Sequence, residues 1–493
     1  MSALMIQGCG SDVGKSVLVA GLCRLFANRG RAVRPFKSQN MSNNAAVTAE
    51  GGEIGRAQAL QARACRVVPT VDMNPVLLKP QTDVGAQLIV RGRMSGTLEA
   101  SAFRTDKRDL LAVAMDSFRR LQRAADLVIV EGAGSPAETN LRAWDIANMG
   151  LAQALELPVV LVGDINRGHV IASLVGAHTV LDSADRERIR GFIINKFRGD
   201  ATLFEEGVQR IVAHTGWTPL GIVPWLQAAG RLPSEDGVRL EDPQERRGCA
   251  RVRIAVPMLS RISNFDEFDA LRAEPDVELS FIAPGRPLPA DATLVILPGT
   301  KSTLGDLECV RAQGWDIDLL AHLRRGGRVL GICGGYQMLG ARVSDPAGIE
   351  GPAGSAPGLG LLDVETVMTP GKRLRDVSGA LIGAPFGCGR APFSGYEMHI
   401  GVTSGPGTER PLVELDDGTT DGAVSADQQV AGCSIHGLFG MTAARSALVA
   451  ALGAVPGGQD HPAGVDAALD EIAAALERHL DINRLEAIAH GRV

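Results

Sequence analysis

The sequence lacks the features of a nucleic-acid-binding or membrane protein. Its 493 residues carry a formal net charge of −6 and the pI is near 5.9. A surface that binds nucleic acid normally has an excess of basic charge, so we expect no nucleic-acid partner. No apolar run approaches the roughly 20 residues that span a bilayer, and no charged leader with an apolar core precedes the first motif. We therefore expect no membrane insertion.

The chain also lacks closely spaced cysteine pairs. None of its eight cysteines stands in a C-x-x-C pair, the spacing of zinc and redox sites. Reduced thiols and a cytoplasmic location are the natural interpretation. The 45% hydrophobic and 22% charged residues are ordinary for a soluble globular protein, and the length suffices for two or three domains.

Short apolar runs alternate with helical patterns along the chain. Buried β-branched runs of this kind predict a mostly parallel sheet covered by helices on both faces, the α/β class. The first series of runs covers residues 4–7, 32–36, 127–130, 159–162, 189–195 and 220–223, and the second covers 252–256, 277–282, 293–297 and 328–332.

Between the two series, the chain loses its apolar periodicity and becomes rich in charge. We expect a phosphate-binding α/β domain over residues 1–230, a linker over 231–250, a second α/β domain over 251–447 and a helical extension over 448–493. Within the extension, residues 465–482 show apolar side chains at helical spacing.

A glycine-rich turn, Gly8-Cys9-Gly10-Ser11-Asp12-Val13-Gly14-Lys15-Ser16, follows the first apolar run and precedes a helical pattern. In such a loop, backbone N–H groups and the helix N-terminus bind phosphate, Lys15 neutralises it, and the Ser16 hydroxyl ligates Mg²⁺. The candidates for binding ATP are therefore Gly10, Asp12, Gly14, Lys15 and Ser16. The usual pattern, G-x-x-x-x-G-K-[ST], has a glycine where this chain has Cys9. A glycine turn that binds nothing is the alternative.

Two acidic residues are candidates for the same region. Glu131 ends the apolar run 127–130, and a carboxylate at the carboxyl end of such a strand can hold Mg²⁺ above a nucleotide. Asp145 lies near another strand end and is a candidate for binding substrate or phosphate. Either residue could instead cap a helix.

Amide and hydroxyl side chains crowd behind a lysine in residues 35–44. Such groups can bind phosphate oxygens and a polar substrate without adding charge. The alternative is a polar turn that hydrogen-bonds its own backbone. The candidates in this run are Lys37 for phosphate and Gln39, Asn40, Ser42 and Asn43 for substrate or phosphate.

A second motif, Gly331-Ile332-Cys333-Gly334-Gly335-Tyr336-Gln337, stands at a predicted strand-to-helix junction. The tight turn of a nucleophile elbow tolerates only small neighbours and presents its central side chain above the sheet. A helix N-terminus there lowers the pKa of a thiol, which favours Cys333 as a nucleophile. The N–H of Gly334 and the loop that contains Gly299 could bind an oxyanion. A buried structural cysteine is the alternative.

A nucleophilic cysteine needs a base, and His436 is the candidate, at the end of the predicted strand 433–436. His399, in Gly395-Tyr396-Glu397-Met398-His399, is its competitor. Together, the two motifs predict that nitrogen taken from glutamine at Cys333 is used in an ATP-driven step.

Over nearly its whole length, the chain resembles the cobyric acid synthase family, glutamine-hydrolysing ligases of cobalamin biosynthesis. The first domain is similar to the dethiobiotin synthetase-like branch of phosphate-loop proteins, which shares the displaced glycine, and the second is similar to class I glutamine amidotransferases. The residues that carry the resemblance are 8–16, 35–44, 131–135, 145–149, 331–337, 395–399 and 434–437.

The resemblance implies ATP-, Mg²⁺- and glutamine-dependent amidation of the b, d, e and g carboxylates of adenosylcobyrinic acid a,c-diamide, or of the hydrogenobyrinic form. It implies acyl phosphate intermediates, a glutamyl thioester on Cys333, and His436 as the base. The small-molecule substrates would be the corrinoid acid, L-glutamine and ATP.

The sequence departs from the related patterns at two places. Class I amidotransferases usually place a glutamate two residues after the histidine, where this chain has Leu438. The sequence therefore leaves the third member of the triad open, and Glu397 or a backbone carbonyl could orient His436. Related synthetases place an Mg²⁺-binding acid after the lysine strand, whereas residues 38–49 contain none.

Two other functions compete with this interpretation. Cobyrinic acid a,c-diamide synthase shares both domains but acts on other carboxylates, and residues 35–43 favour the first function over it. An ATP-driven switch or partitioning protein would have the phosphate loop, but it would not need the thiol of Cys333.

Overall fold

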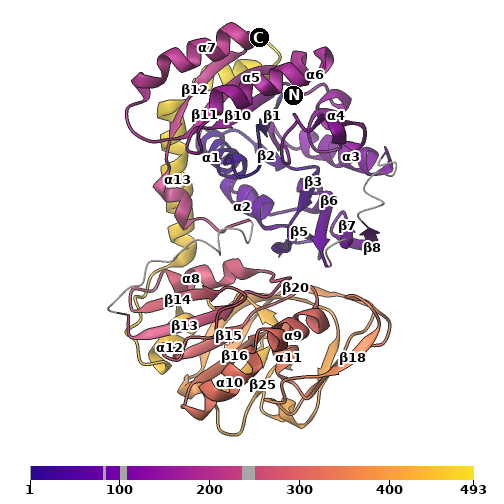
Figure 1. Cartoon of the computed structure of the whole chain (residues 1–493), viewed down its shortest axis with the longest axis vertical. Coiled ribbons are helices and arrows are strands. Elements are labelled where there is room, and N and C mark those ends of the chain that lie inside the picture. The colour runs from indigo at the N-terminus through magenta and orange to yellow at the C-terminus, as the bar shows by residue number, and fades with distance from the viewer. Residues whose placement is uncertain (1, 82–84, 100–107, 236–249, 383–384, 493) are drawn as a thin grey trace.

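The computed structural model describes residues 2–81, 85–99, 108–235, 250–382 and 385–492. The chain forms two lobes stacked along its long axis (Figure 1). Most of the predicted linker, residues 236–249, lies outside the described residues. Among the residues that are described, no helix is long and apolar enough to span a bilayer, and the seven described cysteines are all free.

The upper lobe is built on a six-stranded parallel sheet with strand order β12-β11-β10-β1-β9-β2. Each predicted apolar run of the first series is a strand of this sheet, as expected for runs buried on both faces. The strands are β1 (Ser2–Gly8), β2 (Val33–Phe36), β9 (Leu127–Glu131), β10 (Val159–Asp164), β11 (Ile189–Phe197) and β12 (Thr218–Pro224).

Two apolar cores, one on each face, hold helices against this sheet. One core joins the sheet to α1 (Lys15–Asn28) and to two C-terminal helices, α13 (His461–His479) and α14 (Ile482–Ala489). The other joins it to α3 (Arg108–Arg123), α4 (Met149–Ala154), α5 (Val170–Val180) and α7 (Glu205–Thr215). Two further helices of this lobe are α2 (Arg56–Ala64) and α6 (Ser183–Arg188).

The end of the chain returns to the upper lobe. After α12 (Thr442–Ala451), which packs in the lower lobe, α13 runs along the upper lobe, shown in yellow in Figure 1. Its buried side chains Leu469, Ile472 and Leu476 share the core of α1. The sequence predicts the packing face of this helix correctly, but it does not indicate that the partner is the first domain.

The lower lobe contains a second six-stranded sheet with strand order β14-β13-β15-β16-β26-β25. All of its pairs are parallel except β25 with β26, and the four predicted strands of the second series are confirmed. The strands are β13 (Val252–Pro257), β14 (Val277–Ile282), β15 (Leu294–Leu297), β16 (Arg328–Ile332), β25 (Ala423–Val424) and β26 (Val430–Cys433).

Helices and two smaller sheets complete the lower lobe. The smaller sheets have strand orders β24-β23-β20-β21-β27 and β18-β17-β19-β22. The helices are α8 (Asp269–Arg272), α9 (Thr303–Ala312), α10 (Trp315–Arg324) and α11 (Gly334–Leu339). The strands are β17 (Arg342–Asp345), β18 (Gly354–Pro357), β19 (Glu365–Val367), β20 (Arg373–Leu381), β21 (Ala391–His399), β22 (Val402–Ser404), β23 (Val413–Leu415), β24 (Thr420–Asp421) and β27 (Ile435–His436).

A layer of short strands at the base of the upper lobe faces the lower lobe (Figure 1). An apolar cluster joins Ala45, Leu77 and Ile89 of this layer to Met398 of the lower lobe. The sequence does not predict this layer, whose strands lie between the two candidate sites (Figure 1). Its strands are β3 (Gln39–Met41), β4 (Ala45–Val47), β5 (Glu53–Gly55), β6 (Val76–Pro80), β7 (Gly85–Val90) and β8 (Arg93–Glu99).

Candidate functional site

The phosphate loop runs from the end of β1 into α1, as the sequence predicts. Gly14 has φ +94°, a left-handed conformation that residues with side chains rarely adopt. Asn195, at the end of β11, donates from Nδ2 to the carbonyl of Val13 at 2.8 Å. The neighbouring Lys196 donates to the carbonyl of Asp12. These contacts fix the turn that begins α1, where backbone N–H groups and the helix dipole favour an anion.

Lys15 is buried, with 8% exposure, and lies across this loop. Its Nζ donates to the carbonyl oxygens of Gly10 at 2.9 Å and Gly134 at 3.0 Å. Burial is the main cause that lowers the pKa of Lys15. The ammonium therefore lies where a phosphate would be stabilised.

Three predicted residues meet at one point beside the loop. The Ser16 hydroxyl lies 2.8 Å from Oε1 of Glu131, and Nζ of Lys37 lies 3.0 Å from the same oxygen. A fourth residue, Glu235, was not predicted: its Oε2 lies 2.8 Å from the Ser16 hydroxyl and its Oε1 lies 3.0 Å from Lys37. Burial acts to lower the pKa of Lys37, but the two carboxylates outweigh burial and raise it.

The polar side chains that follow Lys37 mainly form hydrogen bonds with other groups of the upper lobe. Asn40 donates to Oε1 of Gln58 at 3.0 Å, and its own Oδ1 accepts from the N–H of Met41. Ser42 donates to the carbonyl of Glu235 at 3.1 Å. Asn43 is partly buried, and its Oδ1 has no hydrogen-bond partner within the described parts of the chain. Gln39 is partly buried in β3. A role of these residues in binding substrate stays a prediction.

Asp145 adopts the capping arrangement that the sequence analysis left open. Its Oδ1 accepts from the N–H groups of Ala147 and Asn148 at 2.8 Å each, and its Oδ2 accepts from Gly150 at 2.9 Å. These three bonds satisfy N–H groups at the start of α4, as a helix-capping carboxylate does. A substrate contact of Asp145 stays a prediction.

The nucleophile elbow forms at the junction of β16 and α11. Cys333 has φ +52° and ψ −113°, an unusual conformation for a residue other than glycine. A Cβ on Gly335 would lie 2.0 Å from the carbonyl oxygen of Leu297, so only glycine fits behind the cysteine. Strain of this kind is found at functional sites, where the surrounding structure holds it in place.

His436 lies beside Cys333, at the end of β27. His436 is fully buried and interacts electrostatically with Cys333, whose thiol lies 3.7 Å from the carbonyl oxygen of Met398. Nδ1 of the imidazole lies 2.9 Å from Oε1 of Glu267, which is in a short helical turn after β13. Burial acts to lower the pKa of His436, but Glu267 and Cys333 outweigh it and raise the pKa to about 10. Cys333, His436 and Glu267 thus lie in the spatial sequence of a thiol, an imidazole and a carboxylate, the arrangement of a candidate triad.

Of the two groups that could orient His436, Glu397 is not in contact with it. Glu397 lies beside His399, 3.7 Å from Nε2, and forms ion pairs with Arg373 and Arg375. The carboxylate on His436 comes instead from Glu267, whose Oε2 also accepts from the N–H of Gly437 at 3.1 Å. No local spacing in the sequence marks Glu267, because it precedes the histidine by 169 residues.

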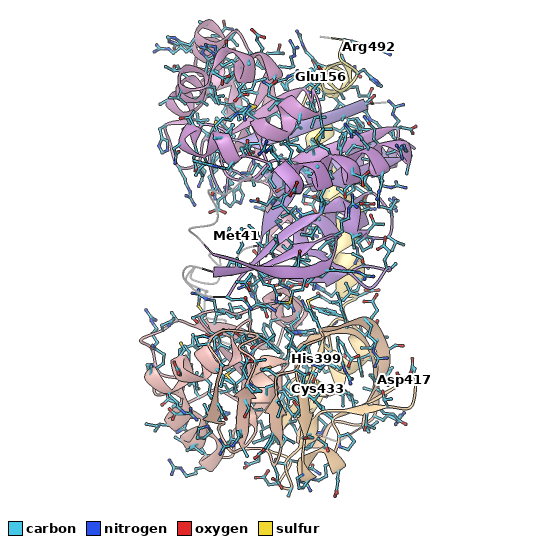
Figure 2. All side chains as sticks on the ribbon, turned by 90° about the vertical axis from the view of Figure 1, so that its right-hand side faces the viewer. Met41, Glu156, His399, Asp417, Cys433 and Arg492 are labelled. Carbon is cyan, nitrogen blue, oxygen red and sulfur yellow. The ribbon has the colours of Figure 1, made fainter. Side chains whose placement is uncertain are left out.

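A pocket opens beside the thiol. A Cβ on Gly299 would lie 2.8 Å from Cε1 of His436, and Gly334 begins α11, so both predicted oxyanion residues flank the triad. Figure 2 places His399 and Cys433 in the lower lobe, beneath the boundary with the upper lobe. The lining residues include Ser263, Asn264, Thr300, Lys301, Gln337, Glu350 and His399 from the lower lobe and Lys79 from the upper lobe.

Residues from the upper lobe also support the triad. The Arg56 guanidinium donates to the Tyr396 hydroxyl at 2.7 Å and lies 3.0 Å from Asp266, the residue before Glu267. The Tyr396 ring stacks on the imidazole of His436, with ring centroids 5.3 Å apart. The two lobes are therefore joined directly behind the imidazole of His436.

Comparison with known proteins identifies both lobes. Residues 4–238 match the CobQ/CobB/MinD/ParA nucleotide binding domain, and residues 253–444 match the CobB/CobQ-like glutamine amidotransferase domain. The chain is 67% identical to cobyric acid synthase from Caulobacter sp. (strain K31), over 99% of this chain and all of that protein. The chain belongs to the cobyric acid synthase family.

A second member of the cobyric acid synthase family, from Rhizorhabdus wittichii, is 60% identical over 99% of both chains. Among solved structures, PurLQS from Thermotoga maritima is 16% identical, with a TM-score of 0.29 over 44% of this chain and 97% of that chain. The likeness to PurLQS is too small to carry an argument. The combination of a nucleotide-binding α/β domain and a glutamine amidotransferase domain, expected from the two motifs, is confirmed.

Proposed function

We propose that the chain catalyses ATP- and glutamine-dependent amidation of the b, d, e and g carboxylates of a corrinoid a,c-diamide, the reaction implied by its resemblance to cobyric acid synthases. The main support is the triad of Cys333, His436 and Glu267 beside an interface whose other side carries a phosphate loop. A protein with both centres can release nitrogen at one site and activate a carboxylate at the other.

The glutaminase half-reaction follows from the triad geometry. Cys333 attacks the side-chain carbonyl of glutamine while His436, oriented by Glu267, holds the thiol proton. The tetrahedral intermediate carries its negative charge toward the N–H of Gly334 and the loop of Gly299, which are proposed to stabilise it. His436 then gives its proton to the leaving ammonia, and water hydrolyses the thioester.

The pocket beside Cys333 has a charge pattern that suits the ends of an amino acid. Lys79 and Lys301 contribute positive charge and Glu350 contributes negative charge. The two ring nitrogens of His399 are buried without a hydrogen-bond partner among the described residues. We therefore assign Lys79 to the α-carboxylate of glutamine and Glu350 to its ammonium group.

Replacing Lys79 tests this assignment. Lys79→Met is expected to raise KM for glutamine about tenfold, because a charge-assisted hydrogen bond of about 1.5 kcal/mol is lost, and to leave KM for ammonia unchanged. Steady-state kinetics with each nitrogen source measures both. Lys372→Met is the matched control, since Lys372 pairs with the same Glu53 as Lys79 but is not among the residues that line the pocket. An equal rise of KM in both variants would show that Lys79 acts only through Glu53.

The ligase half-reaction takes place at the phosphate loop. Lys15, Lys37 and the N-terminus of α1 stabilise the phosphates of ATP while the substrate carboxylate becomes an acyl phosphate, which ammonia attacks. Ser16 and Glu131 offer the hydroxyl and carboxylate oxygens that Mg²⁺ prefers, so the residues fit this ion. When bound, Mg²⁺ would offset the negative charge of the phosphates during transfer.

A chain of buried polar groups connects the two centres. Nδ2 of Asn264 lies 3.4 Å from Nε2 of His436, and Oδ1 of Asn264 accepts from the N–H of Ala45 at 3.1 Å. The preceding residue, Asn44, donates to the carbonyl of Glu235 beside Lys37. We propose that ammonia crosses the interface along this line, because in bulk water it would be protonated and lose its nucleophilicity.

The assay that tests the function uses the full chain with ATP, Mg²⁺, glutamine and a corrinoid a,c-diamide. Mass spectrometry of the corrinoid should show the change for four conversions of a carboxylic acid to a primary amide. With ¹⁵N-amide glutamine and added unlabelled ammonium, the product amides should keep the label. No mass change with the a,c-diamide, together with the change for two amidations when cobyrinic acid is supplied, would favour a cobyrinic acid a,c-diamide synthase. No mass change with either corrinoid would favour a nucleotide-dependent switch. The triad makes a switch the weaker alternative, since a switch needs no thiol nucleophile.

A further inference from the structure

Glu235 reaches into the nucleotide site from the predicted linker, far along the chain from the phosphate loop. Its side chain is partly buried, with 16% exposure, and its carboxylate contacts both Ser16 and Lys37. The backbone there is also anchored: the carbonyl of Glu235 accepts from Ser42 at 3.1 Å and from Asn44 at 3.4 Å. This anchoring gives the polar run after Lys37 a role, since it places the end of the linker over the site.

The two carboxylates around Ser16 share its single hydroxyl proton, and both also accept from Nζ of Lys37. The Ser16 hydroxyl lies 2.8 Å from an oxygen of Glu131 and 2.8 Å from an oxygen of Glu235, but it has one proton to donate. Gln61 donates from Nε2 to the other oxygen of Glu131, while its own buried carbonyl oxygen has no hydrogen-bond partner in the described part of the chain. A set of two carboxylates, a hydroxyl and a free amide oxygen is rich in acceptors.

Acceptor-rich sites of this composition bind hard cations. Mg²⁺ takes oxygen ligands, usually one or two carboxylates together with waters and substrate phosphates. The charges of Lys15 and Lys37 are already balanced by those of Glu131 and Glu235, so ATP would bring uncompensated negative charge. A divalent cation between the phosphates and the carboxylates supplies what the side chains lack.

We propose that Glu235 completes the Mg²⁺ site with Ser16 and Glu131, and that it takes the place of the acid absent from residues 38–49. The inference rests on the proposed use of ATP. One consequence is that the segment joining the two lobes carries a ligand of the nucleotide site. In the competing arrangement, the Glu235 carboxylate stands where a phosphate would bind and must leave before ATP enters. The two arrangements predict opposite effects of removing its charge.

Metal binding measured apart from catalysis distinguishes them. The full chain is titrated with Mn²⁺, in place of Mg²⁺, with a non-hydrolysable ATP analogue present, and free Mn²⁺ is followed by electron paramagnetic resonance. Glu235→Gln is expected to raise the Kd for Mn²⁺ about tenfold or more, as loss of a charged ligand should, while binding of the analogue in EDTA is not weakened. Glu235→Asp keeps the charge, and its Kd for Mn²⁺ should lie between those of the original chain and of Glu235→Gln.

Glu471→Gln is the matched control. Glu471, in α13, forms an exposed ion pair with Arg231, which lies four residues before Glu235. The variant therefore removes a carboxylate that contacts the same stretch of chain but lies outside the nucleotide site. Its affinity for Mn²⁺ should equal that of the original chain. The proposal is overturned if Glu235→Gln leaves the affinity for Mn²⁺ unchanged. It is also overturned if the only effect of Glu235→Gln is tighter binding of the ATP analogue, both with and without metal. If the unmodified chain binds neither the analogue nor Mn²⁺, the proposed use of ATP fails, and this inference fails with it.

Discussion

Cys333→Ala is expected to abolish amidation with glutamine while amidation with ammonia continues. Removing the nucleophile leaves no route to the thioester, and losses in comparable hydrolases are about 10⁴-fold or greater. The ligase centre lies in the other lobe and uses none of the groups on the elbow, so ammonia supplied at high concentration should still attack the acyl phosphate. The rate of product formation is measured with glutamine and with ammonia on one preparation, and the ratio of the two rates tests the prediction.

Another cysteine provides the control for this variant. Cys309→Ala removes a thiol from α9 that is partly exposed and lies outside the pocket, and both nitrogen sources should remain usable. Glutamine use that survives in Cys333→Ala would contradict the assignment of the nucleophile. An equal loss with ammonia would show that the cysteine supports the fold instead of the chemistry.

The motifs that the sequence predicts correctly are made of consecutive residues. The phosphate loop and the elbow each need glycines where the backbone is tight, and this requirement is visible in the order of residues alone. The strands of both large sheets are also recognisable, since strands buried on both faces are continuous apolar runs. Lys15, Ser16, Glu131 and Cys333 therefore lie where the patterns place them.

Contacts between distant segments could not be predicted in this way. Glu267 and Glu235 approach His436 and Ser16 only because the chain folds back across 169 and 219 residues. Neither acid stands in a recognisable spacing. The sequence also cannot show that Asp145 accepts from three backbone N–H groups, because an acid near a strand end is equally consistent with a ligand and with a helix cap.

The layer between the lobes contributes residues to the candidate site around Cys333. Lys79 lines the pocket beside Cys333, Arg56 contacts the tyrosine stacked on His436, and both belong to the upper lobe. This pocket is therefore lined by residues of both lobes. The proposed binding of glutamine there would require the lobes to be packed together.

Glu267→Gln is expected to lower kcat/KM for glutamine by about 10³- to 10⁴-fold, the effect of removing the carboxylate from a comparable triad. Glu267 is one of the groups that outweigh burial and hold the pKa of His436 at about 10. Without it, burial dominates and the pKa falls. Since the imidazolium must protonate the departing ammonia, the alkaline limb of the pH profile should move from near pH 10 to lower pH.

The same linkage predicts how stability changes with pH. A histidine whose pKa is raised in the folded state contributes stability that is fully present below its unfolded pKa, about 6.5, and is lost as the pH rises toward 10. In Glu267→Gln this contribution should shrink, so thermal unfolding should depend less on pH between 6.5 and 10. Glu397→Gln is the control, because Glu397 lies beside His399 and not His436. A shift of the alkaline limb in Glu397→Gln, with none in Glu267→Gln, would assign the triad to the wrong acid.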